Sequence, residues 1–375
     1  MSTPMNDYDN RALKDIRAWQ GRKSSRRLRN AIPESVRERA GELVVRGKQR
    51  AGEIVDDIPG SEQVKQALME ALEGATRTIG TGAAASVRTS LVIQRYRKAG
   101  HSIERIEDIQ DLELAASDRV FPRRKRLAYV VTSGAEGAVA GAATTVTGVA
   151  TVVTGVFGAG AGGVPTAIVT AGVMAADTAA TLMWASRIVA ETSALYGYDP
   201  NDPAEQVFMT GVLGAATATS DGTKLAAQRQ LRELAKLLAR RQPYRLLDKH
   251  AFTHVVRQAY ARLGDKMTQK QLGKVVPVTS IVVGASMNAA LMHRTAEEAY
   301  YAYRERRLLD RYDLDPSDGD HDASRIIVDA EVVDDSEEPL DIIGLLDEAQ
   351  RESAVVDEEA SDEDPGRGAK DGRSA

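Results

Sequence analysis

The chain has 375 residues, of which 43% are hydrophobic but only 5% aromatic, and its formal net charge is −5. It has no cysteine, which excludes disulfide bonds, thiolate metal sites and a cysteine nucleophile. A chain of this length holds one or two domains with a sizeable core, built here from aliphatic and small side chains.

Charge is segregated toward the two ends. Residues 11–50 have a net charge of +9 and residues 313–375 one of −17. Such blocks usually stay solvated, so we expect a disordered basic arm over 1–33 and an acidic disordered tail over 313–375. The basic arm could touch an anionic membrane surface or attract the tail. It lacks interleaved aromatic residues, so nucleic acid is not expected as a partner. The start of the chain does not resemble a signal peptide.

Between these ends the chain has helical periodicity and helix-boundary signals. Residues 34–84 predict amphipathic helices with a linker, and residues 85–312 predict one helical domain. Within this domain helices are expected at 86–98, within 101–126, at 127–156, 165–196, 203–217, 222–241 and 247–264. Pro277 opens or kinks a last helix that reaches about Tyr312. The predicted fold is all-α, a multi-helix bundle around a central helical hairpin that is rich in small residues.

The hairpin rests on residues 137–176, which contain no charged side chain. Small residues recur at spacings of three and four in its first arm, which predicts a helix face open to close packing. They are Gly134, Gly137, Gly141, Thr144, Gly148, Thr151 and Gly155. Residues 144–156 are largely β-branched, which favours a strand. The helical period and the length of the run outweigh that preference.

Each arm of the hairpin is long enough to cross a bilayer. The first arm has no Leu, Ile or Phe, so its insertion is marginal, and Asp177 lies in the second arm. A buried hairpin is favoured, while a re-entrant insertion and a two-helix span remain open. The basic cluster Arg123, Arg124, Lys125 and Arg126 directly precedes the hairpin. It could hold this end at an anionic membrane surface, or it could be a solvated loop.

A polar cluster is expected on the second arm. Asp177 and Glu191 share a helix face, and Arg187 is four residues before Glu191 and can pair with it. Asn288, on the last helix, could bond across to Asp177 or Arg187. This cluster is either a site for a head group, ion or small polar ligand, or an ion-pair network that fixes helix register.

Other chemistry has weaker support in the sequence. His250 and His254 have a zinc-compatible spacing, but no third ligand is evident and no metal site is predicted. The chain has no phosphate loop, no G-x-S-x-G and no dinucleotide fingerprint, so no cofactor is predicted. The tyrosines and arginines between Tyr300 and Arg307 could lie at a membrane interface or form a solvated helix end.

Two motifs resemble the EcsC family. The first has the form YGYDP…DPxE and comprises Tyr196, Gly197, Tyr198, Asp199, Pro200, Asp202, Pro203 and Glu205. The second includes Pro277, Gly284, Asn288 and Arg304, with Ser280 where the family pattern has glycine. The resemblance covers about residues 85–310 and implies a bacterial protein. It also implies a membrane-related setting, because the family is named after an operon that encodes an ABC transporter. It carries over no assigned reaction.

From these features we expect a non-enzymatic accessory protein that associates with membrane or lipid. Its expected location is the bacterial cytoplasm or, peripherally, the inner face of the cytoplasmic membrane. One alternative is an enzyme of unknown reaction that uses the cluster of Asp177, Arg187 and Glu191. Another is a soluble scaffold that recruits a protein partner through the acidic tail. In that tail Leu340 to Leu346 form an apolar island, which is either a docking motif or incidental.

Overall fold

The computed structural model describes residues 4–21, 79, 82–120, 166–218, 220–240, 249–272, 280–314 and 339–351. Every regular element in these ranges is a helix, so the fold is all-α as predicted. The elements are α1 (Asp7–Gln20), α5 (Thr89–Lys98), the 3₁₀ helix η1 (Glu107–Asp111), α6 (Leu114–Val120), α8 (Thr166–Leu195), α9 (Pro203–Thr217), α10 (Asp221–Arg240), α11 (Lys249–Leu272) and α12 (Ser280–Tyr312). A further helix, the tail helix, covers residues 342–351.

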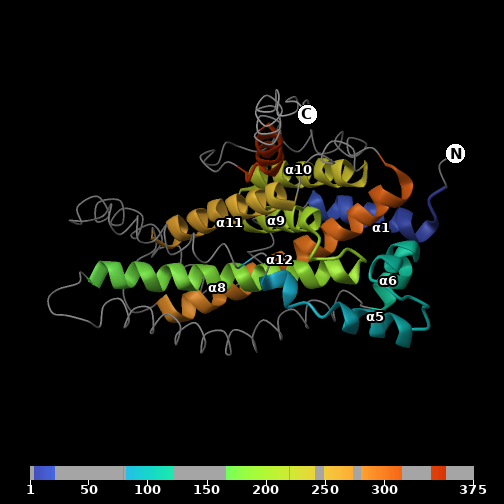
Figure 1. The fold of residues 1–375 in the computed structure, drawn as a ribbon, viewed down its shortest axis with the longest axis horizontal. Coiled ribbons are helices and arrows are strands. Elements are labelled where there is room, and N and C mark those ends of the chain that lie inside the picture. The colour runs from blue at the N-terminus through green and yellow to red at the C-terminus, as the bar shows by residue number, and fades with distance from the viewer. Residues whose placement is uncertain are drawn as a thin grey trace, which may run out of the picture.

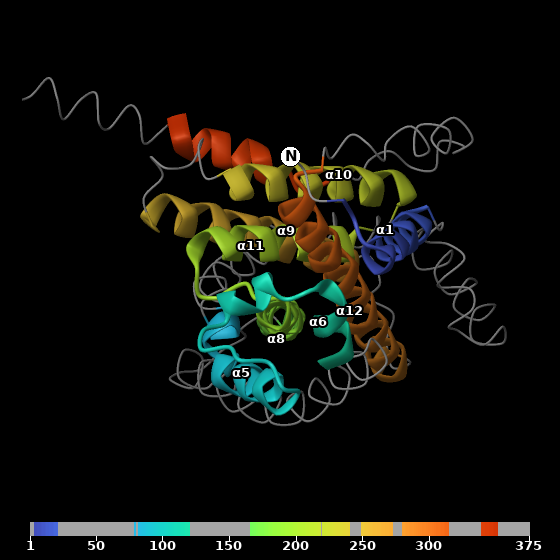
Figure 2. The same ribbon diagram turned by 90° about the vertical axis from the view of Figure 1, so that its right-hand side faces the viewer.

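Helix α9 lies at the centre of the bundle, in contact with α8, α10, α11 and α12 (Figure 1). Its side chains are apolar on nearly all sides, and Val207, Val212 and Leu213 are fully buried. A helix that is hydrophobic all round belongs in a core. Helix α12 packs most extensively against α8 and also contacts α9, α10 and α1. Figure 2 looks along α8 and shows α5, α6, α9 and α12 around it.

Several predicted boundaries are confirmed. The helices expected at 203–217 and 165–196 are α9 and α8, and the last helix begins after Pro277 and ends at Tyr312. Helix α11 continues to Leu272, past the expected end at residue 264. The first arm of the hairpin, residues 34–78 and the cluster Arg123 to Arg126 lie outside the described residues, so the predictions for them stay predictions. Of the helices that the structure describes, none combines the length and apolar character that crossing a membrane requires.

The expectation that residues 1–33 are disordered is wrong for Asp7–Gln20, which form α1. The Asn6 side chain caps this helix by accepting a hydrogen bond from the Asp9 N–H at 2.8 Å. Ala12, Ile16 and Trp19 follow one another at helical spacing and are all buried. The net positive charge of the segment favoured disorder, and the narrow apolar stripe was not recognised in the sequence.

The expectation of a disordered tail also fails for part of the chain. Residues 342–351 are helical, and all but Ile343 of the apolar side chains of the island and of the turn that follows are buried. These are Leu340, Ile342, Leu345, Leu346 and Ala349. The apolar island is therefore part of the packed structure rather than incidental.

Candidate functional site

The first family motif forms the turn between α8 and α9. Gly197 has φ +89°, a conformation that glycine adopts without strain. A Cβ at this position would lie 2.9 Å from Gln110 Cγ and 3.0 Å from Ile109 Cβ, so the turn also needs a residue without a side chain. The Gln110 side-chain amide donates to the Gly197 carbonyl at 2.6 Å, which fastens the turn to η1.

The motif then starts α9. Asp202 is the N-cap residue, and its carboxylate accepts a hydrogen bond from the Ala204 N–H at 3.0 Å. Pro203 occupies the first helical position, where its missing N–H is harmless. Asp199 accepts from the Asn201 N–H at 2.9 Å in the exposed turn before the cap. These residues form the turn after α8 and the N-terminus of α9.

Glu205 is the central acidic group of the site. It is 3% exposed and accepts hydrogen bonds from the Tyr303 hydroxyl at 2.5 Å and from Arg306 Nη1 at 2.6 Å. The Arg306 guanidinium lies 4.0 Å from the Tyr198 ring centroid and 4.3 Å from that of Phe208. The arginine is therefore held between two aromatic faces, with its positive charge directed at the carboxylate.

The pair extends to the end of α12. The Tyr198 hydroxyl donates to Asp310 Oδ2 at 2.6 Å, and Arg306 Nε lies 3.9 Å from the same oxygen. Burial raises the pKa of Glu205, while Arg306 opposes that shift. Burial alone would lower the pKa of Arg306, but Glu205 and its other neighbours raise it overall, so this side chain stays charged. Burial likewise raises the pKa of Tyr198 and of Tyr303 well above 10.

A second branch links α12 to α6 and α1. Arg304 Nη2 lies 2.9 Å from Asp118 Oδ2 on α6. Asp118 also accepts from the Tyr8 hydroxyl at 2.7 Å and from the Tyr196 hydroxyl at 3.1 Å. The motif residue Tyr196 thus meets the motif residue Arg304 through one shared carboxylate.

Arg307 forms a third link. Its Nη1 donates to the carbonyls of Ile109 at 2.8 Å and Tyr196 at 3.1 Å, and its Nη2 donates to that of Leu112 at 2.7 Å. Burial lowers the pKa of Arg307. This side chain joins η1 to the α8–α9 turn through backbone acceptors alone. We call Glu205, Arg304, Arg306, Arg307 and Asp118, with their tyrosine partners, the clamp.

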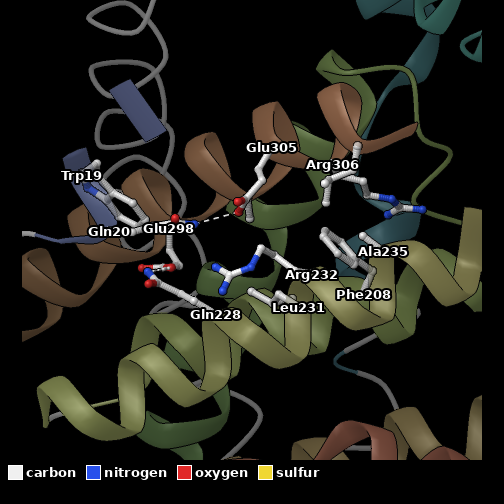
Figure 3. A pocket seen from close by; sticks show the side chains of 12 residues that line it. Trp19, Gln20, Phe208, Gln228, Leu231, Arg232, Ala235, Glu298, Glu305 and Arg306 are labelled. Atoms are coloured by element: carbon white, nitrogen blue, oxygen red, sulfur yellow. Dashed lines mark hydrogen bonds between the residues drawn. The ribbon is translucent and has the colours of Figure 1, made fainter. Parts of the chain in front are cut away.

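Beside the clamp lies a small charged cavity between α1, α9, α10 and α12 (Figure 3). Glu298 pairs with Lys224 at 2.7 Å and accepts from the Gln228 side-chain amide at 2.7 Å. Glu305 accepts from the Gln20 side-chain amide at 2.7 Å. The cavity measures about 10 Å³, which is room for about one water molecule.

The predicted polar cluster is only partly visible. Arg187 Nε lies 3.3 Å from Glu191 Oε1, so the predicted i, i+4 pair is formed. Burial raises the pKa of Glu191, and Arg187 opposes the shift. Asp177 lies in α8, and Asn288 and Gly284 lie in α12, but their side chains are outside the described part. Whether these residues bind a ligand stays a prediction, and Pro277 is also outside.

The interpretation of residues 300–307 as an interfacial or solvated helix end is wrong. Tyr300, Tyr301, Tyr303, Arg304, Arg306 and Arg307 are all buried. The roles of Arg306, Arg307, Asp118 and Trp19 were not predicted from the sequence. A signal was present in part, because residues 300–307 contain three tyrosines and three arginines, an unusual density of aromatic rings for a solvated helix end. The side chain of His250 lies outside the described residues, and within them no group of three metal-binding side chains occurs.

Comparison with known proteins finds a family match over the central part of the chain. Residues 156–308 match the model of the EcsC protein family, a range that includes both motifs. The chain is also 28% identical over 154 residues to "Uncharacterized protein YdbA" of Bacillus subtilis (strain 168). That match covers 40% of this chain and 51% of the relative, so the chain spans about half the length of this curated protein. No solved structure matches the chain. The chain therefore carries an EcsC protein family domain.

Proposed function

We propose that this chain is a non-enzymatic accessory protein that attaches peripherally to an anionic membrane surface. The EcsC domain is the rigid helical scaffold of that attachment. The observation that carries the proposal is the outward face of α5, which combines basic side chains with an exposed leucine. Two further features support it: the charged groups of the clamp are paired within the protein, and the basic cluster follows α6 closely in the sequence.

Helix α5 has a distinct inner and outer face. Val92 and Tyr96 are buried, and the Tyr96 hydroxyl donates to the Leu195 carbonyl at 2.7 Å, which fixes α5 against the end of α8. Arg88, Leu91 and Lys98 are exposed on the other side, and Leu91 is 43% exposed. No acidic residue occurs between residues 88 and 100. An exposed apolar side chain on the same side of a helix as basic side chains is suited to the interface of an anionic bilayer.

The magnitude of the attraction indicates that α5 needs help. A basic residue near an anionic surface contributes roughly 1 kcal/mol. The exposed basic residues Arg88, Arg97 and Lys98 together would supply about 3 kcal/mol, which is weaker than a millimolar dissociation constant. Four more basic residues, Arg123 to Arg126, would bring the sum to about 7 kcal/mol and the dissociation constant to about 10 μM.

The chain can bring these two groups together. Helices α5 and α6 lie at the same end of the molecule in both views (Figures 1 and 2). Arg123 follows Val120, the last residue of α6, by three residues in the sequence. This short separation in sequence supports the idea that both basic groups act at one membrane surface.

The non-enzymatic part of the proposal rests on the clamp. Each of its guanidinium groups pairs with a carboxylate or with backbone carbonyls, although Nε and Nη1 of Arg304 and Nε of Arg306 have no hydrogen-bond partner among the described residues. The described cavity beside the clamp has room for about one water molecule. The charged groups of the clamp therefore serve to join helices. An enzyme built on Arg187 and Glu191 stays the alternative, because that pair is less enclosed, with Arg187 33% exposed.

The proposal is tested with the full chain and sedimenting vesicles of phosphatidylcholine, with and without 30% phosphatidylglycerol. The double variant Arg88→Gln/Lys98→Gln should bind the anionic vesicles about 30-fold more weakly, since two charges worth roughly 1 kcal/mol each are lost. The matched control is Arg257→Gln/Arg262→Gln, which removes two exposed charges from α11 and should bind nearly as the parent does. Binding should also be lost at 1 M salt, where the Debye length is about 3 Å. Equal binding to neutral vesicles, or equal loss in both variants, would rule the proposal out.

A further inference from the structure

We propose that α9 and α10 form a docking groove for a short amphipathic helix. The chain's own tail segment, residues 339–351, occupies this groove as a releasable ligand. The proposal concerns a different surface from the membrane-facing side of α5 and does not depend on it. Figure 2 shows the tail helix in red beside α10.

The tail segment has the pattern of a groove-binding helix. Five of its apolar residues, Leu340, Ile342, Leu345, Leu346 and Ala349, lie at relative positions 0, 2, 5, 6 and 9 and are buried, while Ile343 is half-buried. Asp341, Asp347, Glu348 and Arg351 are exposed. One apolar side against the protein and one charged side in water is the arrangement by which peptide helices bind grooves.

The groove is shaped by two glycines of α9. Gly211 and Gly214 are three residues apart, so they share a helix face. A Cβ at Gly214 would lie 3.3 Å from both Cβ and Cδ2 of Leu340. A Cβ at Gly211 would lie 3.4 Å from Ile342 Cδ1 and 2.8 Å from Leu231 Cδ2 of α10. The absent side chains leave the space into which Leu340 and Ile342 fit.

The two ends of the chain are attached in different ways. Helix α1 is held by its buried apolar stripe and also by polar contacts, such as the bond from the Tyr312 hydroxyl to Asp9 Oδ2 at 2.6 Å and the bond from Gln20 to Glu305. The contacts of Leu340 and Ile342 with α9 are apolar, while Asp341 and Arg351 bond within the segment itself. Separating these apolar contacts breaks no ion pair of the clamp.

The position of the segment in the chain also favours release. It lies beyond residues 156–308, the range that matches the family, yet it sits on α9 within that range. Twenty-four residues, 315–338, connect it to the end of the described part of α12, and they include ten acidic residues and one arginine. Fully extended, such a connection spans about 80 Å, so the segment can leave the groove while α12 stays in place.

The test uses the full chain and a fluorescein-labelled synthetic peptide of residues 339–351. A short tether gives the chain's own segment a millimolar effective concentration, so the parent should bind the peptide weakly. The double variant Ile342→Asp/Leu346→Asp detaches the tail and leaves the groove intact. Its affinity for the peptide, measured by anisotropy, should be at least about tenfold higher than that of the parent. The control variant Asp347→Asn/Glu348→Gln changes only exposed residues and should behave as the parent does.

A third variant checks the site of binding. Gly214→Val, added to the detached double variant, places side-chain atoms where Leu340 would lie and should abolish peptide binding. Equal affinities of parent and detached variant, or unchanged binding after Gly214→Val, would overturn the proposal. If the detached variant does not fold, amide exchange of the parent decides. Tail amides that exchange before those of α9 support release, and tail amides that exchange only together with α9 refute it.

Discussion

Glu205 and Arg306 join the first turn of α9 to the last turns of α12 through a buried ion pair, with Oε2 and Nη1 2.6 Å apart. Glutamate at the third position of a helix often bonds back to the N–H of the cap residue. Here the Asp202 N–H donates instead to the Asp199 carbonyl at 3.0 Å. The Glu205 carboxylate is thereby available to α12. The motif glutamate thus serves tertiary structure rather than the helix start alone.

The hydrogen bond from Tyr303 to Glu205 should contribute more than one between neutral groups. Tyr303→Phe should lower the free energy of unfolding by about 1.5–3 kcal/mol, because the acceptor is a buried carboxylate. The matched control is Tyr260→Phe, since Tyr260 is equally buried but donates to the neutral Ser186 hydroxyl at 2.9 Å. Tyr260→Phe should lower the free energy of unfolding by about 0.5–1.5 kcal/mol. Denaturant unfolding compares the two, and a larger loss for Tyr260→Phe would argue against a special role for Glu205.

Stability should depend on pH through Glu305. Burial raises the pKa of this carboxyl group, while Arg232, Gln20 and Arg17 oppose the shift. Between the ordinary and the raised pKa, the folded chain holds the proton and the unfolded chain has lost it. Stability contributed by this group is therefore lost as pH rises through that window.

The variant Glu305→Gln cannot titrate, so its melting temperature should fall less than that of the parent between pH 5 and pH 8. Glu233→Gln, at an exposed position of α10, should keep the parent's slope. A Glu305→Gln variant with the same slope as the parent would show that this group does not carry the dependence.

Gly197 should tolerate no side chain. Gly197→Ala places a Cβ about 3 Å from Gln110 and Ile109 at a positive φ. Gly100 has nearly the same backbone conformation, with φ +90°, but a Cβ there would meet no atom within 4 Å. The two alanine variants share the backbone strain of roughly 1–2 kcal/mol. Gly197→Ala should therefore cost about 1–3 kcal/mol more than Gly100→Ala, by the overpacking alone. Equal melting temperatures of the two variants would refute the close approach of η1.

Local signals predicted most of the fold. Asp202 and Pro203 marked the start of α9, and the helical period predicted α8 and α12 almost to their ends. Arg187 and Glu191 pair as their spacing predicts. Each of these features depends on residues close together in the chain, where helix geometry fixes the distance.

Contacts between distant segments could not be predicted in this way. Arg304 and Asp118 are far apart in the chain, and no local pattern indicates that they meet. The high net charge of the N-terminal segment led to the wrong expectation of disorder. Helix α1 packs against α12, and the apolar residues Ala12, Ile16 and Trp19 on one face are enough for this packing. The rings of Trp19 and Tyr301 stack with their centroids 4.2 Å apart, so part of the segment that was expected to be solvated lies in the core. The buried arginines of α12 were mistaken for surface residues because their partners come from α6, η1 and α9.

The central claim is that the charged motif residues join helices. The most direct test is a double-mutant cycle at Glu205 and Arg306, measured by denaturant unfolding of the full chain. Glu205→Met and Arg306→Met should each cost about 3–5 kcal/mol, because each leaves a buried charge without its partner. The double variant should cost less than the sum of the two single changes by at least about 2 kcal/mol. Costs that simply add, with no coupling between the two positions, would contradict the account.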